Sequence, residues 1–127
     1  MSKKRFNEMT IAEITQEIYA NNFVKGFNDE PDVDKWVASQ LANMHAEVSE
    51  LWDAYRSGTE REPCDKCDKM VLIGFPPNAL TKEEEECADI IIRALGFARH
   101  RGIDIARAMF VKHVYNTTRP HMHGKKN

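Results

Sequence analysis

Hydrophobic residues recur at helical spacing in four stretches of the chain, and no stretch reads convincingly as a β-strand. The clearest stretch follows Pro31. Its apolar positions come in steps of three and four residues: Val37, Leu41, Met44, Val48, Leu51 and Tyr55. This seam is typical of a helix that packs against other helices, and Ser57-Gly58 supplies its stop signal.

Capping signals delimit the other three predicted helices. Two Thr-x-x-Glu capping boxes predict helices over residues 10–25 and 81–102. Asp104 is a candidate N-cap for a fourth helix, which is expected to end near Thr117 because Pro120 follows closely. The pattern therefore predicts an all-α chain with a four-helix, bundle-like architecture.

Residues 58–80 are expected to form a long inter-helix loop, because its prolines forbid a helix through it. Within it, Met70 to Phe75 is apolar enough to pack on the domain or to form a short strand. Residues 120–127 are expected to form a basic, partly mobile tail. With these boundaries, residues 1–127 are predicted to be a single helical domain.

The predicted helix over 81–102 is apolar on two sides. One stripe comprises Ala88, Ile91, Ile92 and Leu95, and Ile90 and Phe97 project from roughly the opposite side. A helix that is apolar on both sides must be covered on both sides. A chain with four helices has little to spare for this, so we expect a homo-oligomer.

Composition narrows the classes of function. The chain has 127 residues and a net charge of -2, so no basic field argues for nucleic-acid binding. No stretch approaches the roughly 18 apolar residues that span a bilayer, so no membrane association is expected. Three cysteines make a disulfide framework unexpected and fit a reducing compartment. A soluble cytoplasmic protein is the expectation.

Two pairs of acidic residues suggest a metal site. Glu47 and Glu50 lie three residues apart on the second helix, beside its apolar seam, and Glu86 and Asp89 repeat this spacing on the third. Carboxylates close together repel unless a cation lies between them. Hard oxygen ligands suit Mg²⁺, with Mn²⁺ as a substitute. The alternative is that each pair belongs to a solvated helix face or a charged helix start.

Basic and amide side chains gather at the C-terminal end. Lys112 and Asn116 share a helix face, and Arg119 follows just beyond it. Lys112 and Arg119 could hold phosphate oxygens, and Asn116 could contact a ribose or a phosphate. The alternative is a cationic helix end that stabilises the helix dipole.

Three segments together resemble the MazG-like family of all-α nucleoside triphosphate (NTP) pyrophosphohydrolases. His45-Ala-Glu-Val-Ser-Glu-Leu-Trp-Asp-Ala-Tyr-Arg56 resembles the first motif, and Glu86-Cys-Ala-Asp-Ile-Ile-Ile-Arg93 resembles the second. Lys112-His-Val-Tyr-Asn-Thr-Thr-Arg-Pro-His-Met-His-Gly-Lys125 resembles the closing segment. The segment between Glu50 and Glu86 is long for the family, so it could lie over the active site or be a surface addition.

The resemblance implies a homodimer or homotetramer that cleaves a nucleoside triphosphate to its monophosphate and pyrophosphate. The implied biological role is the removal of aberrant or surplus nucleotides from the nucleotide pool. The acidic residues implied to be catalytic and to ligate Mg²⁺ are Glu47, Glu50, Glu86 and Asp89. The residues implied to lie near the nucleotide are Lys112, Asn116, Arg119 and Lys125. Trp52 is a further candidate because it could stack a base, although packing is the alternative for it and for Trp36.

Other interpretations remain open at this point. The same chemistry on a biosynthetic substrate would make the chain a phosphoribosyl-ATP pyrophosphohydrolase. A non-catalytic helical oligomerisation or regulatory module would explain the seam but not the carboxylates. A di-iron carboxylate bundle would require Glu-x-x-His pairs, which the acidic pairs do not provide. Cys64-x-x-Cys67 provides only two of the ligands that a zinc site needs. Cys87 or a histidine would have to complete the site.

Overall fold

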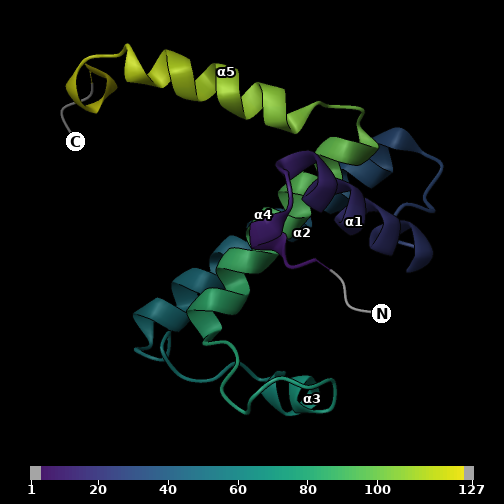
Figure 1. Ribbon diagram of the computed structural model, residues 1–127, viewed down its shortest axis with the longest axis vertical. Coiled ribbons are helices and arrows are strands. Elements are labelled where there is room, and N and C mark those ends of the chain that lie inside the picture. The colour runs from purple at the N-terminus through teal and green to yellow at the C-terminus, as the bar shows by residue number, and fades with distance from the viewer. Residues whose placement is uncertain (1–3, 125–127) are drawn as a thin grey trace. The chain divides into compact units, whose positions relative to one another are not determined.

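The computed structural model describes residues 4–124, and their side chains as far as Met122. This part of the chain holds five α-helices, two short 3-10 helices and no β-strand (Figure 1). The α-helices are α1 (Ile11–Val24), α2 (Val33–Arg56), α3 (Cys67–Val71), α4 (Lys82–His100) and α5 (Ile105–Thr117). The 3-10 helices are η1 (Phe6–Glu8) and η2 (His121–Gly124). The prediction of an all-α chain is confirmed.

Local chemistry sets the starts of three of the helices, as predicted. The Glu13 N–H donates to Thr10 Oγ1 at 3.1 Å and the Thr10 N–H donates to Glu13 Oε1 at 3.0 Å, which satisfies two orphan donors at the start of α1. Thr81 and Glu84 form the same reciprocal pair before α4. Asp104 caps α5 through its side chain.

The prediction that residues 58–80 form a loop without helix is wrong over five residues. Helix α3 occupies Cys67–Val71, between the prolines rather than through them. A helix this short shows no apolar period in the sequence, so the pattern could not reveal it. The expected packing or strand at Met70 to Phe75 is also wrong, since Leu72 and Ile73 are strongly exposed.

The chain divides into two compact units, and each is described by itself. Residues 28–94 contain α2, α3 and most of α4. The other unit, within the described part of the chain, combines residues 4–27 with residues 95–124 and contains α1, the end of α4, and α5.

In the unit of residues 28–94, α2 and α4 lie side by side (Figure 1). The buried residues of this unit are Trp36, Glu47, Ala54, Cys64, Cys67 and Glu86. The face of α2 that is buried is therefore the stripe beside the seam. Seam residues Leu41, Val48 and Tyr55 are exposed, whereas Val37, Met44 and Leu51 are partly buried, so only part of the seam packs within the described chain.

In the other unit, α1 packs on the last turns of α4. Ile18, Leu95 and Ala98 are buried there. Helix α5 contacts α1 but has no buried residue, and it exposes Phe110, among other large apolar side chains. Across the described part of the chain, no helix is both long and apolar enough to cross a membrane.

Candidate metal centre

An ion pair between α2 and α4 holds the first carboxylate of the site. Arg93 Nε, on α4, donates to Glu47 Oε1, on α2, at 2.9 Å. Glu47 is only 8% exposed, so its charge is largely removed from water and depends on this partner. The sequence placed Glu47 at the edge of the core, and the structure confirms its burial.

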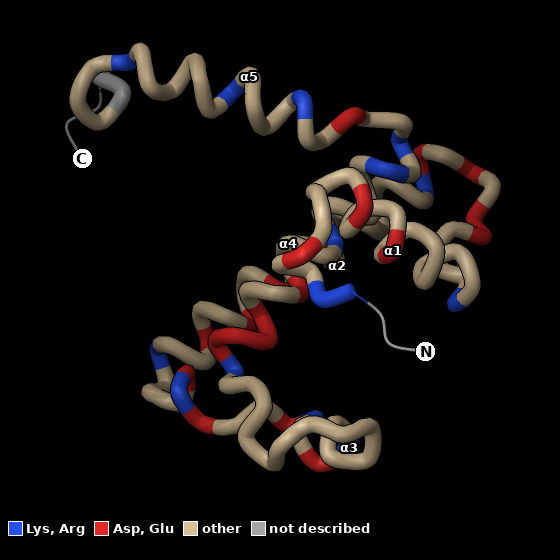
Figure 2. The backbone as a smooth tube through the Cα atoms, viewed as in Figure 1, with Lys and Arg blue, Asp and Glu red and all other residues tan. Residues whose placement is uncertain are grey.

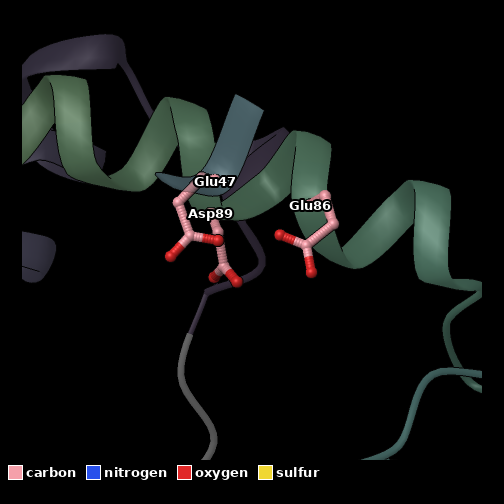
Figure 3. A group of neighbouring side chains, drawn as sticks. All are labelled: Glu47, Glu86 and Asp89. Carbon is pink, nitrogen blue, oxygen red and sulfur yellow. The ribbon is translucent and has the colours of Figure 1, made fainter. Parts of the chain in front are cut away.

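Glu86 and Asp89 join Glu47 from α4. Each of the three residues offers a carboxylate oxygen, and these oxygens all lie within 4.8 Å of one another. Figure 3 shows the three side chains converging from the two helices. Acidic residues are numerous on these same stretches of α2 and α4 (Figure 2). We refer to Glu47, Glu86 and Asp89 as the carboxylate cluster.

The three carboxylates of the cluster differ in the direction in which their pKa values are shifted. Burial raises the pKa of Glu86 to about 8, and hydrogen bonding to Glu47 and Glu50 adds to the effect. Burial and the Glu47 charge also raise the pKa of Asp89. Burial alone would raise the pKa of Glu47, but hydrogen bonds with Glu86 and Arg93 outweigh it and lower that pKa. At neutral pH, Glu47 is therefore charged and Glu86 holds a proton.

Two oxygens of the cluster have no hydrogen-bond partner. Oε2 of Glu47 and Oε2 of Glu86 are buried and unpartnered, and Glu86 as a whole is only 9% exposed. A buried polar atom without a partner costs about 1–3 kcal/mol. A divalent cation among these oxygens would satisfy them, and hard oxygen donors are the ligands that Mg²⁺ and Mn²⁺ prefer. The residues therefore fit a metal.

Glu50, the fourth acidic residue proposed from the sequence, lies at the margin of the cluster. It is exposed, and its proximity helps to raise the pKa of Glu86. A pocket of about 270 Å³ opens beside it. The pocket is lined by Glu50, Asp53, Ala54, Ser57, Thr59, Asp65, Lys82, Glu85 and Glu86. The structure thus brings Glu50 next to the cluster, on the side where the pocket opens.

Arg93 is the residue of the site that sequence reasoning missed. It lies four residues after Asp89 and seven after Glu86, so all three share one face of α4. This spacing was a usable signal. Arg93 belongs to the quoted second motif, but no role was given to it.

The basic residues proposed for the nucleotide belong to the other unit. Lys112 Nζ lies 4.9 Å from the centroid of the Tyr115 ring, and Arg119 Cζ lies 5.5 Å from it. Asn116 Oδ1 is buried without a partner. Lys112 and Asn116 line a pocket of about 410 Å³, whose other walls are largely apolar. The structure therefore groups these three residues on α5 and just past its end.

The remaining candidates have different outcomes. Trp36 is buried and donates to Asn28 Oδ1 at 3.2 Å, so it packs rather than stacks a base. Trp52 is exposed, and its ring stacks on Tyr55 with 6.2 Å between centroids. Lys125 lies outside the described residues. Among the described residues, the carboxylate cluster is the one group of three or more metal-ligating side chains, and Cys64 and Cys67 do not belong to such a group there.

Comparison with known proteins adds no assignment. The chain matches no protein-family model, no curated protein and no solved structure. The geometry of the carboxylate cluster and the three sequence motifs are therefore the features that point to a function.

Proposed function

We propose that the chain is a Mg²⁺-dependent NTP pyrophosphohydrolase of the MazG-like type. The reaction adds water across the anhydride bond between the α- and β-phosphates and yields a nucleoside monophosphate, pyrophosphate and a proton. Clearing surplus or aberrant nucleotides in the cytoplasm is the biological role that this activity would serve.

The carboxylate cluster carries the proposal. The two acidic pairs of the motifs lie on facing helices, and three of their four carboxylates come within 4.8 Å of one another with two buried oxygens unpartnered. A solvated helix face would not bury Glu47 and Glu86 to this degree. A cation held there would neutralise charge on the triphosphate and lower the pKa of a water molecule.

The side chains of the site would have separate roles in binding the cation, activating water and binding the substrate. Glu47 and Glu86 would hold the cation from opposite helices, with Asp89 as a third ligand and Arg93 fixing the position of Glu47. Glu50 is an exposed carboxylate of the pocket, as are Asp53 and Asp65, and its place in the first motif favours it as the general base that accepts the proton of the attacking water. Lys112 and Arg119 would contact phosphate oxygens, and Asn116 and Trp52 the nucleoside.

The proposal includes a homo-oligomer. Helix α2 exposes Leu41, Val48 and Tyr55 along one face, and α5 exposes apolar residues along its length. Large exposed apolar surfaces of this kind mark protein–protein contacts. A second copy of the chain would cover them in a dimer or in a tetramer built from two dimers.

The test is pyrophosphate release from each common NTP and dNTP with Mg²⁺, beside an EDTA control and the Glu50→Gln variant. We expect release that EDTA abolishes and that Glu50→Gln lowers by about 10²-fold or more, because the variant loses the general base. Glu30→Gln, an exposed acidic site outside the motifs, is the matched control and should retain full activity.

Two outcomes would redirect the proposal. Release from phosphoribosyl-ATP alone would keep the chemistry and change the substrate to the biosynthetic one. Absence of release from all substrates, together with no Mg²⁺-dependent rise in melting temperature, would favour the non-catalytic oligomerisation module.

A further inference from the structure

The segment before α3 is anchored on the start of α4. The Cys64 N–H donates to the Leu80 carbonyl at 2.9 Å, and Cys67 Sγ donates to the same carbonyl at 3.2 Å. The Lys82 N–H donates to the Glu62 carbonyl at 2.9 Å. These bonds tie both ends of the segment to the turn that begins α4. The position of residues 62–67 is therefore fixed relative to the start of α4, and Glu86 of the carboxylate cluster follows Lys82 by four residues.

The two cysteines are packing residues of this anchor. Their Sγ atoms lie 3.4 Å apart, and each residue is only 4% exposed. Burial raises the pKa of the Cys64 thiol to about 11, so the thiolate form is scarce at neutral pH. Buried, protonated thiols of this kind are inert. The anchor holds the residues between the two cysteines in place.

Lys66, between the two cysteines, is brought to the acidic site. Its Nζ lies 3.7 Å from Glu85 Oε1, and its side chain is 61% exposed while that of Glu85 is 14% exposed. The distance exceeds that of a hydrogen bond, so charge alone holds the pair. Attraction to Glu85 and, more weakly, to the three carboxylates of the cluster raises the pKa of Lys66.

We propose that Lys66 binds the phosphate oxygens of the substrate and of the pyrophosphate product in the metal-loaded site. This inference rests on the proposed function and adds a residue to the same site. A cation bound in the carboxylate cluster offsets the weaker attraction that the cluster exerts on Lys66, whereas Glu85 still faces its ammonium. With its side chain 61% exposed and its ion pair with Glu85 longer than a hydrogen bond, the ammonium can take a phosphate oxygen as a further partner. A flexible ammonium is well suited to phosphate oxygens.

Position favours Lys66 over Lys69 for this role, and Lys82 is a second lysine beside the same acidic residues. Lys69, on α3, is also exposed but has no ion pair among the described side chains. Glu85, the partner of Lys66, also lines the pocket beside Glu50. The long segment between the two acidic pairs would therefore supply a positive charge to the site, from the same unit as the carboxylates.

The test compares Lys66→Met with the control Lys69→Met, and pyrophosphate is titrated at a Mg²⁺ concentration that saturates each protein. Two quantities are measured by calorimetry: the affinity for Mg²⁺ alone, and the affinity for inorganic pyrophosphate once Mg²⁺ is bound. We expect Lys66→Met to weaken pyrophosphate binding about 10-fold, the loss of one charge-assisted hydrogen bond. The same variant should bind Mg²⁺ as tightly as the wild type or more tightly, because a competing cation is gone.

Weaker pyrophosphate binding together with unchanged or tighter Mg²⁺ binding distinguishes a phosphate-binding role of Lys66 from a structural one. A variant that only disturbed the segment would weaken Mg²⁺ and pyrophosphate binding together, and that result would overturn the inference. Unchanged pyrophosphate affinity in Lys66→Met would overturn it as well. Lys66→Arg, which keeps the charge, should restore most of the affinity.

The two proposals fail differently. Wild-type protein that binds Mg²⁺ and pyrophosphate but cleaves no nucleotide would contradict the proposed function and leave the binding comparison intact. Wild-type protein that cleaves NTPs while Lys66→Met binds pyrophosphate normally would contradict only the role of Lys66. Wild-type protein that binds neither ligand would overturn both.

Discussion

Arg93 Nε and Glu47 Oε1 are joined at 2.9 Å across the contact between α2 and α4. The pair does more than connect two helices. It helps to keep the buried carboxylate of Glu47 charged, whereas burial raises the pKa of the neighbouring Glu86 to about 8.

Arg93→Met should destabilise the metal-free protein, because Glu47 would be left buried without its cation. We expect the free energy of unfolding to fall by about 1–3 kcal/mol, measured by urea denaturation in EDTA. Arg61→Met removes an exposed arginine of the same unit and should change it by less than about 0.5 kcal/mol. Equal stability of the two variants would show that the ion pair has no net effect.

Stability without metal should depend on pH through Glu86. Its folded pKa of about 8 lies above the ordinary value of 4.5, so the folded state retains a proton that the unfolded state loses. Its stabilising contribution is complete below pH 4.5 and is lost as the pH rises through 8.

Glu86→Gln, which cannot titrate at this position, isolates that contribution. In EDTA, the wild type should lose stability relative to Glu86→Gln between about pH 5 and pH 9. The comparison is made by denaturant unfolding at several pH values. A stability difference that does not change with pH would contradict the raised pKa.

Mg²⁺ binding at pH 7 should release protons. The cation requires the charged form of Glu86, whose pKa of about 8 leaves it mostly protonated at pH 7. Calorimetry in two buffers of different ionisation enthalpy measures the number released, and we expect a value approaching one. The affinity for Mg²⁺ should accordingly rise with pH until about pH 8. Binding with no proton release would place the cation elsewhere.

Val48→Lys should weaken self-association, because it places a charge on the exposed seam of α2. Light scattering of the wild type should give a dimer or a tetramer, and the variant should shift toward smaller species. Ser39→Lys changes an exposed polar site on the opposite side of α2 and should leave the assembly intact. A wild type that is monomeric at micromolar concentration would contradict the proposed oligomer.

The sequence predicted what depends on nearby residues. The starts of α1, α4 and α5 follow from Thr10, Thr81 and Asp104, whose side chains bond backbone groups within three residues. The carboxylate pairs follow from helical spacing in the same way.

Long-range contacts were not predictable to the same degree. Hydropathy selects Leu41 and Val48 as the packing face of α2, yet the stripe that packs on α4 contains Glu47. The ion pair with Arg93 makes the burial of Glu47 tolerable, and this pair is not visible in a hydropathy pattern. Lys66 was missed because its position depends on buried cysteines that are distant in sequence from the cluster.

Glu47 and Val48 are consecutive residues on neighbouring faces of α2, one buried in the carboxylate cluster and the other exposed on the seam. If the seam joins two copies, assembly and metal binding share one helix, and the two equilibria are thermodynamically linked. Dilution that separates the copies would loosen the hold on the cation, and adding the cation would draw the copies together. The specific activity of such a protein would fall as its concentration fell. A low expression level would therefore lower the activity of each molecule as well as the number of molecules.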